Sequence, residues 1–331
     1  MTIAAILVIG AGGIGLKHID VLSSLEGYQI KCFDLNGDTL DIVKQRYPQI
    51  DVYKSLEQLD CQHLTGAIIA TPTDTHIEYA NWCVDMRIPF LVEKPLSSSI
   101  NGVEELMKRC ISVNLVCGIA FPRRSGDPYQ TIKRKLDQGM LGELKLIRSN
   151  FSQNFRKYRP DYSRTYYSKY QSGGGIIMDA LSHHVNLHAY YAGEIIGVSA
   201  IGERLVLENI EVEDSAFISM KFRGGVIGNI AGNQFQKPNE DFIELVGTNG
   251  NMRYERLSGV LEWNTSDEVA WHREYVSGDW YLILKSQIMN FLSAIKSNAN
   301  CNTSVEEGVN QLKVILAARE SMRTGRFTQI E

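Results

Sequence analysis

The sequence contains few cysteines, and none of them are arranged in CxxC pairs. Six cysteines are spread over 331 residues, most of them within apolar runs. Disulfide-rich secreted domains and zinc ribbons space their cysteines in close, regular pairs, so neither class fits this chain. We therefore expect reduced thiols and a cytoplasmic protein.

Long apolar runs and a strong charge imbalance are also missing. No apolar stretch approaches the roughly 18 residues of a membrane span, and the net charge of −4 comes without a long basic run. The first apolar run, IAAILVIGAGGIGL, lacks the cationic leading segment of a signal peptide. We therefore expect neither a membrane nor a nucleic acid as a partner.

The first third of the chain alternates short apolar runs with amphipathic stretches. The apolar runs predict strands at 4–10, 28–33, 66–70, 88–93 and 115–120. The amphipathic stretches predict helices at 13–25, 37–46, 75–86 and 103–113. Alternating strands and helices indicate right-handed βαβ crossovers, so we expect an α/β domain with a doubly wound parallel sheet.

After residue 121 the pattern changes. The next predicted elements are a helix, a strand and a glycine-led helix at 124–139, 143–153 and 173–186. Between 197 and 272 strands follow one another, and two helices close the chain. Consecutive strands flanked by helices predict an α+β domain with a large, mostly antiparallel open sheet. The length suits two domains of about 150 residues, which we place at 1–121 and 122–331.

The segment VIGAGGIG carries the spacing GxGxxG between a predicted strand and a predicted helix. Gly10 permits a tight turn, Gly12 lets the backbone approach a pyrophosphate, and Gly15 lets the helix pack closely on the strand. The start of the helix, at Gly13 and Ile14, offers backbone N–H groups and a positive dipole end to phosphates. These residues therefore predict a dinucleotide site; a glycine turn that binds nothing is the alternative.

The acidic residue Asp34 ends the second predicted strand, nineteen positions after Gly15. Its carboxylate can accept hydrogen bonds from the adenosine ribose hydroxyls and would repel a 2′-phosphate. Lys31 precedes it, and no arginine follows directly. The cofactor is therefore expected to be NAD rather than NADP.

A second loop, ATPTDTH at 70–76, ends the strand predicted at 66–70. Open α/β sheets bind ligands beyond the carboxyl ends of their strands, so we expect this loop to run along the cofactor. Its candidate contacts are Thr71, Pro72, Thr73 and His76. Helix capping by Thr73 or Asp74 is the simpler alternative, and the two roles are compatible.

The strand predicted at 88–93 ends in Glu93-Lys94-Pro95. A lysine at the carboxyl edge of a parallel strand faces the same crevice as the glycine turn. Its ammonium could hold a substrate hydroxyl and stabilise negative charge as the proton leaves. A solvated surface lysine is the alternative for such a residue taken alone.

These segments together resemble the Gfo/Idh/MocA oxidoreductases, named for glucose–fructose oxidoreductase and inositol dehydrogenase. The resemblance covers nearly the whole chain and rests on VIGAGGIG, ATPTDTH, VEKPLS, GGGIIMDALSHH and VNQLKVILAARESMRTGR. It implies an NAD(P)-binding Rossmann domain, to which Glu93 and Lys94 contribute, and a C-terminal domain whose open sheet joins subunits into a homodimer or homotetramer. It also implies hydride transfer between a nicotinamide and a hydroxyl or carbonyl carbon of a sugar or cyclitol.

The resemblance further implies three catalytic residues: Lys94, Asp179 and His183. His183 would take the substrate hydroxyl proton, and Asp179 would orient the imidazole or bind the substrate. Positions i and i+4 share one face of an α-helix, which agrees with such a pair. Without the resemblance, an Asp/His pair on a helix is more often structural.

Three positions in the glycine-led helix depart from many relatives. Leu181 often corresponds to glycine, Asn186 to aspartate, and His184 to another residue. Because His184 and Asn186 lie next to the substrate position, we expect both to contact the substrate. His184 and His188 have the i, i+4 spacing of a metal pair, but no third ligand is evident, so no metal is expected.

The segment 154–170 combines five basic residues with five tyrosines and directly precedes this helix. Arginine forks suit carboxylates and phosphates, so Arg156, Arg159 and Tyr162 are candidate contacts to an anionic or nucleotide-linked sugar. Arg123 lies where relatives often place an arginine close to the nicotinamide or substrate. Tyrosine packing or a subunit contact is the alternative use of this segment.

The leading hypothesis is therefore an NAD-dependent dehydrogenase or reductase of such a sugar. Three others stay open: an inositol-type cyclitol dehydrogenase, a glycosidase that uses bound NAD transiently, and a non-enzymatic NAD-sensing regulator. A regulator has no need for Lys94, Asp179 and His183 together, so their joint presence argues against it.

Overall fold

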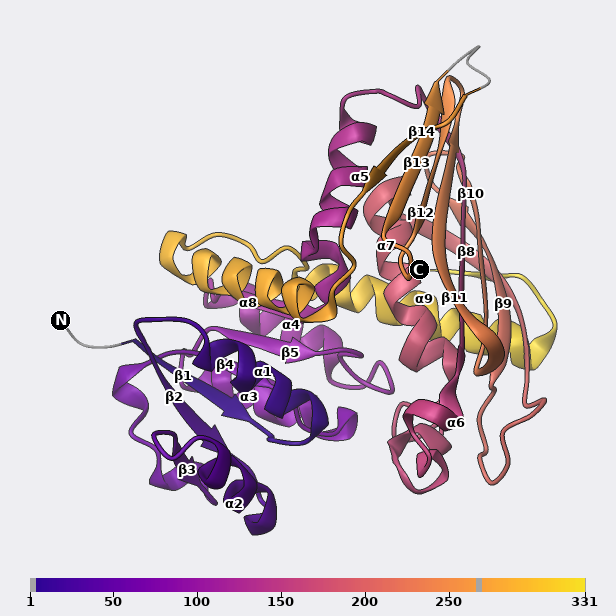
Figure 1. The fold of residues 1–331 in the computed structure, drawn as a ribbon. Helices are drawn as coiled ribbons and strands as arrows, with labels where there is room; N and C mark the ends of the chain where they lie inside the picture. The colour runs from indigo at the N-terminus through magenta and orange to yellow at the C-terminus, as the bar shows by residue number, and fades with distance from the viewer. Residues whose placement is uncertain (1–3, 266–269, 331) are drawn as a thin grey trace. The chain divides into compact units, whose positions relative to one another are not determined.

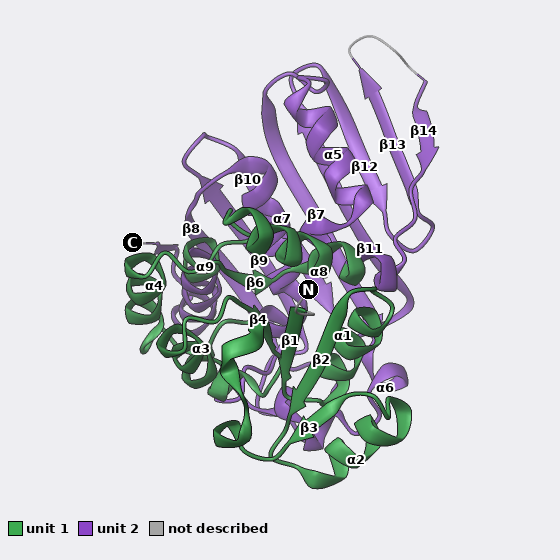
Figure 2. Cartoon of the chain, turned by 90° about the vertical axis from the view of Figure 1, so that its left-hand side faces the viewer, with its two compact units in different colours: residues 1–122, 284–309 green, residues 123–283, 310–331 purple. Residues whose placement is uncertain are grey.

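The computed structural model describes residues 4–265 and 270–330 and contains two compact units. Unit 1 comprises the chain up to Pro122 together with Leu284–Val309. Unit 2 comprises Arg123–Ile283 and the chain from Asn310 onward. Figure 2 shows the two units in different colours. Among the described helices, none is long and apolar enough to cross a membrane.

Unit 1 is built on a six-stranded sheet in the order β3-β2-β1-β4-β5-β6. Every neighbouring pair of strands is parallel, which confirms the doubly wound sheet. The strands are β1 (Ala4–Ile9), β2 (Tyr28–Phe33), β3 (Asp51–Tyr53), β4 (Leu64–Ile69), β5 (Phe90–Glu93) and β6 (Cys117–Ala120). The helices between them are α1 (Gly13–Ser23), α2 (Gly37–Arg46), α3 (His76–Asp85) and α4 (Val103–Ser112) (Figure 1).

The strands β1, β4 and β5 are almost entirely buried. Parallel strands covered on both faces read as continuous apolar runs, which is why their positions could be predicted closely. Strand β3 was not predicted because its three half-buried residues form no apolar run. It extends the sheet at the edge, beside β2.

The helix α8 (Trp280–Ser297) supplies part of the core of unit 1. Its Leu284, Ile288 and Phe291 pack in one buried cluster with residues of β1 such as Ile6. Gly66 in β4 makes room for this helix, since a Cβ there would lie 2.8 Å from the Ile295 side chain. The domain division expected from the sequence assigned all of 122–331 to the second domain, whereas these contacts group Leu284–Val309 with the first.

Unit 2 is built on a nine-stranded sheet in the order β14-β13-β12-β11-β7-β10-β9-β8-β15. The pair β7–β10 is parallel and the other pairs are antiparallel, which confirms the mostly antiparallel sheet. The strands are β7 (Leu144–Asn154), β8 (Ile195–Glu203), β9 (Ser215–Phe222), β10 (Ile227–Asn233), β11 (Phe235–Gly247), β12 (Gly250–Glu255), β13 (Val260–Thr265), β14 (His272–Tyr275) and β15 (Thr328–Gln329). The short strands β14 and β15 were not predicted.

The helices of unit 2 are α5 (Asp127–Asp137), α6 (Phe155–Tyr158), α7 (Ser182–Ala192) and most of α9 (Val305–Thr324). Helix α7 packs against β7 and β10. Two glycines of β10 permit this approach: a Cβ at Gly228 would lie 3.2 Å from the His188 ring, and one at Gly232 would lie 2.7 Å from the Leu181 side chain. The sheet therefore supports the segment in which the catalytic pair was expected.

The glycine-led segment is not one regular α-helix. Residues Ile177–Leu181 form a π-helical turn, and the α-helix α7 begins only at Ser182. Asp179 therefore lies in the π turn and His183 in the α-helix, so the α-helical i, i+4 argument does not describe this pair. Single π turns within helices occur often at functional sites.

Candidate functional site

The glycine turn after β1 has the geometry of a dinucleotide-binding loop. Gly10 has a positive φ of +91°, and a Cβ there would lie 2.8 Å from the Ala70 carbonyl oxygen. A Cβ at Gly15 would overlap the Gly10 carbonyl oxygen. By contrast, a Cβ at Gly12 or Gly13 would have no atom within 4 Å. The backbone is therefore packed tightly at two glycines and exposed at the other two, as a close approach by pyrophosphate requires.

The N-terminus of α1 also fits a phosphate. Its N-cap, Gly12, makes no side-chain capping hydrogen bond, and the first turn carries no acidic residue. The first backbone N–H groups of a helix lack partners inside the helix and carry the positive end of its dipole. This end of α1 can therefore bind an anion without displacing a side-chain cap.

Asp34 lies just beyond the end of β2 and joins the turn directly. Its Oδ2 accepts a hydrogen bond from the Ala11 backbone N–H (2.8 Å), and its Oδ1 accepts one from the Asn36 N–H (2.8 Å). Lys31 is buried beside the Tyr53 ring. Lys54 lies near Gly37: a Cβ added to this glycine would be 2.6 Å from the Lys54 Nζ. The Asp34 carboxylate therefore lies beside the glycine turn, and Lys54, which follows β3, lies close to Gly37 at the start of α2.

His76 connects the loop at 70–76 to the loop that begins at Lys94, here called the lysine loop. Its Nδ1 lies 2.9 Å from the Pro95 carbonyl oxygen, and its Nε2 lies 2.9 Å from the Thr71 carbonyl oxygen. The ring is buried, and burial lowers its pKa although both carbonyl contacts oppose that shift. His76 thus links two loops at the carboxyl ends of β4 and β5. Neither Thr73 nor Asp74 caps the following helix.

Glu93 ends β5 and Lys94 follows it, and their side chains differ in exposure. Glu93 is buried, and its Oε1 lies 2.8 Å from Nε2 of the fully buried His18 on α1. Its Oε2 accepts a hydrogen bond from the Lys94 backbone N–H (3.2 Å). Lys94 is half-buried and precedes a cis bond to Pro95. Glu93 therefore holds the start of the lysine loop against α1 through His18, a residue that sequence reasoning missed.

In unit 2, the glycines before the π turn accommodate close neighbours. Gly173 and Gly175 have positive φ values of +82° and +89°. A Cβ at Gly175 would lie 2.5 Å from Oε1 of Glu213, a buried carboxylate. That oxygen accepts a hydrogen bond from the Ile177 N–H (3.0 Å). Glu213, also missed from the sequence, therefore anchors the start of the π turn.

Asp179 is 8 % exposed and takes part in a short chain of hydrogen bonds. The Tyr166 hydroxyl donates to Asp179 Oδ1 (2.9 Å), and Arg159 Nη1 donates to the Tyr166 hydroxyl (2.7 Å). Four residues further on, His183 is half-buried and meets the Trp280 ring edge-on, with ring centroids 6.2 Å apart. The neighbouring His184 and His188 are fully buried by comparison.

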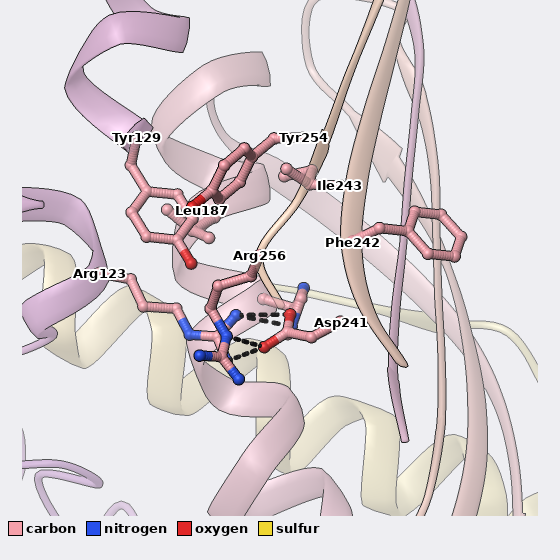
Figure 3. Close-up of a pocket in the computed structure, with 9 residues that line it drawn as sticks. Arg123, Tyr129, Leu187, Asp241, Phe242, Ile243, Tyr254 and Arg256 are labelled. Atoms are coloured by element: carbon pink, nitrogen blue, oxygen red, sulfur yellow. Dashed lines mark hydrogen bonds and ion pairs between the residues drawn. The ribbon is translucent and has the colours of Figure 1, made fainter. Parts of the chain in front are cut away.

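Arg123 and His184 form a buried ionic cluster with Asp241. Arg123 donates two hydrogen bonds to the Asp241 carboxylate (3.0 and 2.9 Å) and lies 3.0 Å from His184 Nε2. The half-buried Arg256 also pairs with Asp241. Figure 3 shows both arginines directed at the one carboxylate. Tyr129 and Tyr254 also line the small hollow beside this cluster. The hollow is too small to hold a water molecule.

The charges in this cluster and its burial determine the pKa values of Asp241 and His184. Burial opposes ionisation of Asp241, but the charge of Arg123, a hydrogen bond with His184 and the charge of Arg256 outweigh it and hold the pKa of that carboxyl well below its usual range. Burial and the neighbouring Arg123 lower the pKa of His184, so its ring is neutral. These contacts favour a structural role for Arg123 and His184, and their substrate contacts stay predictions.

Other candidate substrate residues also have partners within unit 2. Asn186 is buried and donates to Gln311 Oε1 (3.3 Å), and His188 lies 2.9 Å from Ser149 Oγ. Arg156 donates to the Val206 carbonyl (2.9 Å). The buried Tyr162 packs in a small core, where its hydroxyl accepts a hydrogen bond from the Glu208 N–H (3.2 Å). Part of the segment 154–170 is therefore ordered by tyrosine packing, and Arg159 is the candidate arginine that is linked to Asp179 through the Tyr166 hydroxyl.

The fold and the dinucleotide-type turn define a Rossmann-containing oxidoreductase, and two family models agree. Residues 4–121 match the oxidoreductase family with an NAD-binding Rossmann fold, and residues 129–253 match the GFO/IDH/MocA C-terminal domain. Together these matches span well over half of the chain. The chain therefore belongs to the GFO/IDH/MocA family of NAD(P)-dependent oxidoreductases.

Individual relatives resemble the chain over its whole length. It is 24 % identical to a myo-inositol 2-dehydrogenase of Thermotoga maritima, over 98 % of both chains. An oxidoreductase from Agrobacterium radiobacter, solved with NAD⁺, L-tartaric acid and magnesium, has a TM-score of 0.89 at 20 % identity over 99 % of both chains. The WlbA dehydrogenase from Bordetella pertussis, solved with NADH and UDP-GlcNAcA, has a TM-score of 0.81 at 20 % identity, again over 99 % of both chains.

We expect Asp34→Ser to change cofactor preference. Removing the carboxylate removes charge-assisted hydrogen bonds to the ribose hydroxyls and the repulsion of a 2′-phosphate. The KM for NAD should rise about 10-fold or more, as loss of a hydrogen bond to a charged group implies, and the NADP/NAD ratio of kcat/KM should rise as well. Steady-state kinetics with both cofactors measure this.

The exposed Asp38→Ser on α2 serves as the control, and Asp34→Asn keeps an acceptor oxygen for the Ala11 N–H. Combining Asp34→Ser with Lys54→Ala tests whether that lysine assists a 2′-phosphate. An unchanged NADP/NAD ratio in Asp34→Ser would rule out the carboxylate as the discriminating group.

Proposed function

We propose that this protein is an NAD-dependent dehydrogenase or reductase of a sugar that carries an anionic group. The observation that carries the proposal is the pair of hydrogen bonds Arg159–Tyr166–Asp179, which links a guanidinium through the Tyr166 hydroxyl to the acidic residue expected at the catalytic position. Arginine favours carboxylates and phosphates through its planar fork. Arg159 is exposed at the surface of unit 2, where such a group could meet it.

The reaction separates one hydride and one proton from a CH–OH group, and the nicotinamide, when bound, exchanges the hydride. The proton is handled by residues of this chain. His183 accepts the hydroxyl proton on its imidazole, and Asp179 stabilises the imidazolium that results. Lys94 has the role that the family resemblance implies: it donates a hydrogen bond to the substrate and stabilises negative charge that develops on it. In the reductive direction the same groups return the proton.

A second candidate substrate is an uncharged cyclitol. The 24 % identity to a myo-inositol 2-dehydrogenase over 98 % of both chains favours it. The WlbA structure, which contains UDP-GlcNAcA, shares the fold and offers a precedent for a nucleotide-linked sugar acid. The two candidates differ in charge, because inositol offers no anion to an arginine.

A panel of substrates separates these candidates. UDP-GlcNAcA and UDP-GlcNAc form a matched pair that differs in the carboxylate, and myo-inositol represents the cyclitols. We expect UDP-GlcNAcA to exceed UDP-GlcNAc, which lacks the sugar carboxylate, in kcat/KM by about 10-fold or more, the contribution of one charge-assisted hydrogen bond. NADH absorbance follows turnover. Turnover of myo-inositol alone would reject the anionic substrate, and equal rates for the matched pair would reject recognition of the sugar carboxylate, because both members carry the diphosphate.

Removing the proton-handling groups should abolish turnover and spare cofactor binding. Lys94→Ala and His183→Ala are each expected to lower kcat by about 10²- to 10⁴-fold, the usual contribution of a positioned acid or base. NADH fluorescence titration should give a Kd near that of the unmodified protein. The exposed Lys108→Ala and His63→Ala serve as controls. Full turnover by both active-site variants would show that the site assignment is wrong.

We also propose that the open face of the nine-stranded sheet joins subunits. Ile201 and Phe217 lie opposite each other on β8 and β9, and they are 73 % and 58 % exposed. Two further exposed apolar residues, Leu146 and Ile227, are paired on β7 and β10. Exposed apolar pairs on neighbouring strands support a subunit interface on this face.

The double variant Ile201→Asp/Phe217→Asp is expected to be monomeric, because burial of two like charges without a partner opposes association. Light scattering coupled to size-exclusion chromatography measures the mass. Leu257→Arg, in the turn after β12, changes an exposed apolar residue away from this face and is the control. A monomeric unmodified protein, or an unchanged oligomer in the double variant, would contradict the proposed interface.

A further inference from the structure

The hydroxyl of Tyr166 lies between a guanidinium and a carboxylate. It donates to Asp179 Oδ1 at 2.9 Å and accepts from Arg159 Nη1 at 2.7 Å. We propose that Tyr166 is a positioning residue for Asp179, and that the charge of Arg159 acts on the reaction through the Tyr166 hydroxyl. This inference rests on the proposed function, in which Asp179 stabilises the protonated form of His183.

The backbone around Tyr166 is well ordered by its own contacts. Tyr166 begins a short 3₁₀ turn, Tyr166–Ser168, which Thr165 caps by accepting a hydrogen bond from the Tyr167 N–H. Its carbonyl accepts a hydrogen bond from Ser172 Oγ (2.7 Å). The next ring, Tyr167, is fully buried against Phe155, with centroids 4.4 Å apart. Adjacent tyrosines therefore have separate tasks: Tyr167 holds the turn in the core, and Tyr166 reaches Asp179.

The direction of the two hydrogen bonds follows from the chemistry of the groups. A guanidinium has only donors, and an ionised carboxylate has only acceptors. The single phenolic proton must therefore point to Asp179 when Arg159 donates to the same oxygen. Burial and the nearby Asp179 raise the pKa of Tyr166 and outweigh the opposing effect of Arg159, so the hydroxyl keeps its proton.

This arrangement suits a carboxylate that has to stay ionised in a nearly buried place. Asp179 is 8 % exposed, and a buried charge is unfavourable unless it is paired or hydrogen-bonded. Direct contact with Arg159 would pair the charge fully, whereas the intervening hydroxyl transmits only part of the guanidinium field. The Tyr166 hydroxyl thereby holds the Asp179 carboxylate in one orientation.

The guanidinium is also held by ring faces. The Arg159 carbon Cζ lies 5.5 Å from the Phe155 ring centroid and 5.5 Å from that of Tyr166. Cations within about 6 Å of an aromatic face are attracted to it. The Tyr166 ring thus orients Arg159, and its hydroxyl orients Asp179, so one side chain couples the cation to the acid.

The test is a double-mutant cycle of Tyr166→Phe and Asp179→Asn. The panel substrate with the higher kcat/KM, UDP-GlcNAcA or myo-inositol, is the probe. Tyr166→Phe keeps the ring and removes the hydroxyl, and we expect it to lower kcat about 10-fold with little change in the KM for NAD. In the Asp179→Asn background, Tyr166→Phe should have almost no further effect on kcat, because both changes remove the same interaction.

The control is Tyr158→Phe, which removes an exposed hydroxyl from the same segment, one that accepts a hydrogen bond from Asn239. It should leave kcat unchanged. Thermal melting of each variant separates a loss of folding from a loss of chemistry: Tyr166→Phe is expected to melt within a few degrees of the unmodified protein.

The outcomes distinguish this inference from the function on which it rests. If Asp179→Asn reduces kcat but Tyr166→Phe does not, or if the two effects multiply, Tyr166 does not act through Asp179 and the inference is wrong. A lower melting temperature for Tyr166→Phe with unchanged kcat would also overturn it, in favour of a structural role. Full turnover by Asp179→Asn would reject the proposed function itself.

Discussion

A carboxylate removed from water must be met by hydrogen-bond donors, and much of this structure depends on how that requirement is satisfied. In unit 2, Asp214 accepts from three successive backbone N–H groups, at Leu205, Val206 and Leu207 (2.9, 2.8 and 2.6 Å). Asp241 is held by arginines, and Glu213 by the start of the π turn. Asp241 and Glu213 join segments that are distant in the sequence, and Asp214 fixes a nearby loop, so buried carboxylates organise the loops around the sheet.

The same requirement links structure to chemistry at two places. In unit 1, Glu93 joins α1 to the backbone of Lys94, and His76 joins that loop to the loop after β4. In unit 2, Asp179 is met by the Tyr166 hydroxyl. The residues expected to handle the proton are thus held by neighbours that take no direct part in the reaction. Catalytic groups must be positioned within a fraction of an ångström, and such neighbours supply the constraint.

Most of the fold could be predicted because its signals are local. The buried strands β1, β4 and β5 read as apolar runs, and β9 alternates buried and exposed residues along its length. The short edge strands were missed because a few half-exposed residues show no regular alternation of apolar and polar side chains. The contribution of α8 to the core of unit 1 was also missed, because amphipathicity indicates that a helix packs on something but does not identify its partner.

The candidate site could be predicted only in part, and the reasons are physical. The glycine turn is recognisable because close backbone approach excludes every side chain larger than hydrogen, as at Gly15. The segment 154–170 was expected to supply several substrate contacts, yet within it Tyr162 and Arg156 bind other parts of unit 2. Which arginine reaches an acid depends on how the loop packs, and composition contains no information on that.

The sequence by itself determined the alternation of strands and helices, the dinucleotide-type turn with its acidic partner Asp34, and the residue types available for proton transfer. Those features follow from steric and periodic rules that act over a few neighbouring residues. Tertiary structure alone decided that Arg123 and His184 would serve a buried ionic cluster and that Arg159 would reach Asp179 through Tyr166. These pairings join residues between 7 and 118 positions apart in the chain, and only packing brings such groups within hydrogen-bonding distance.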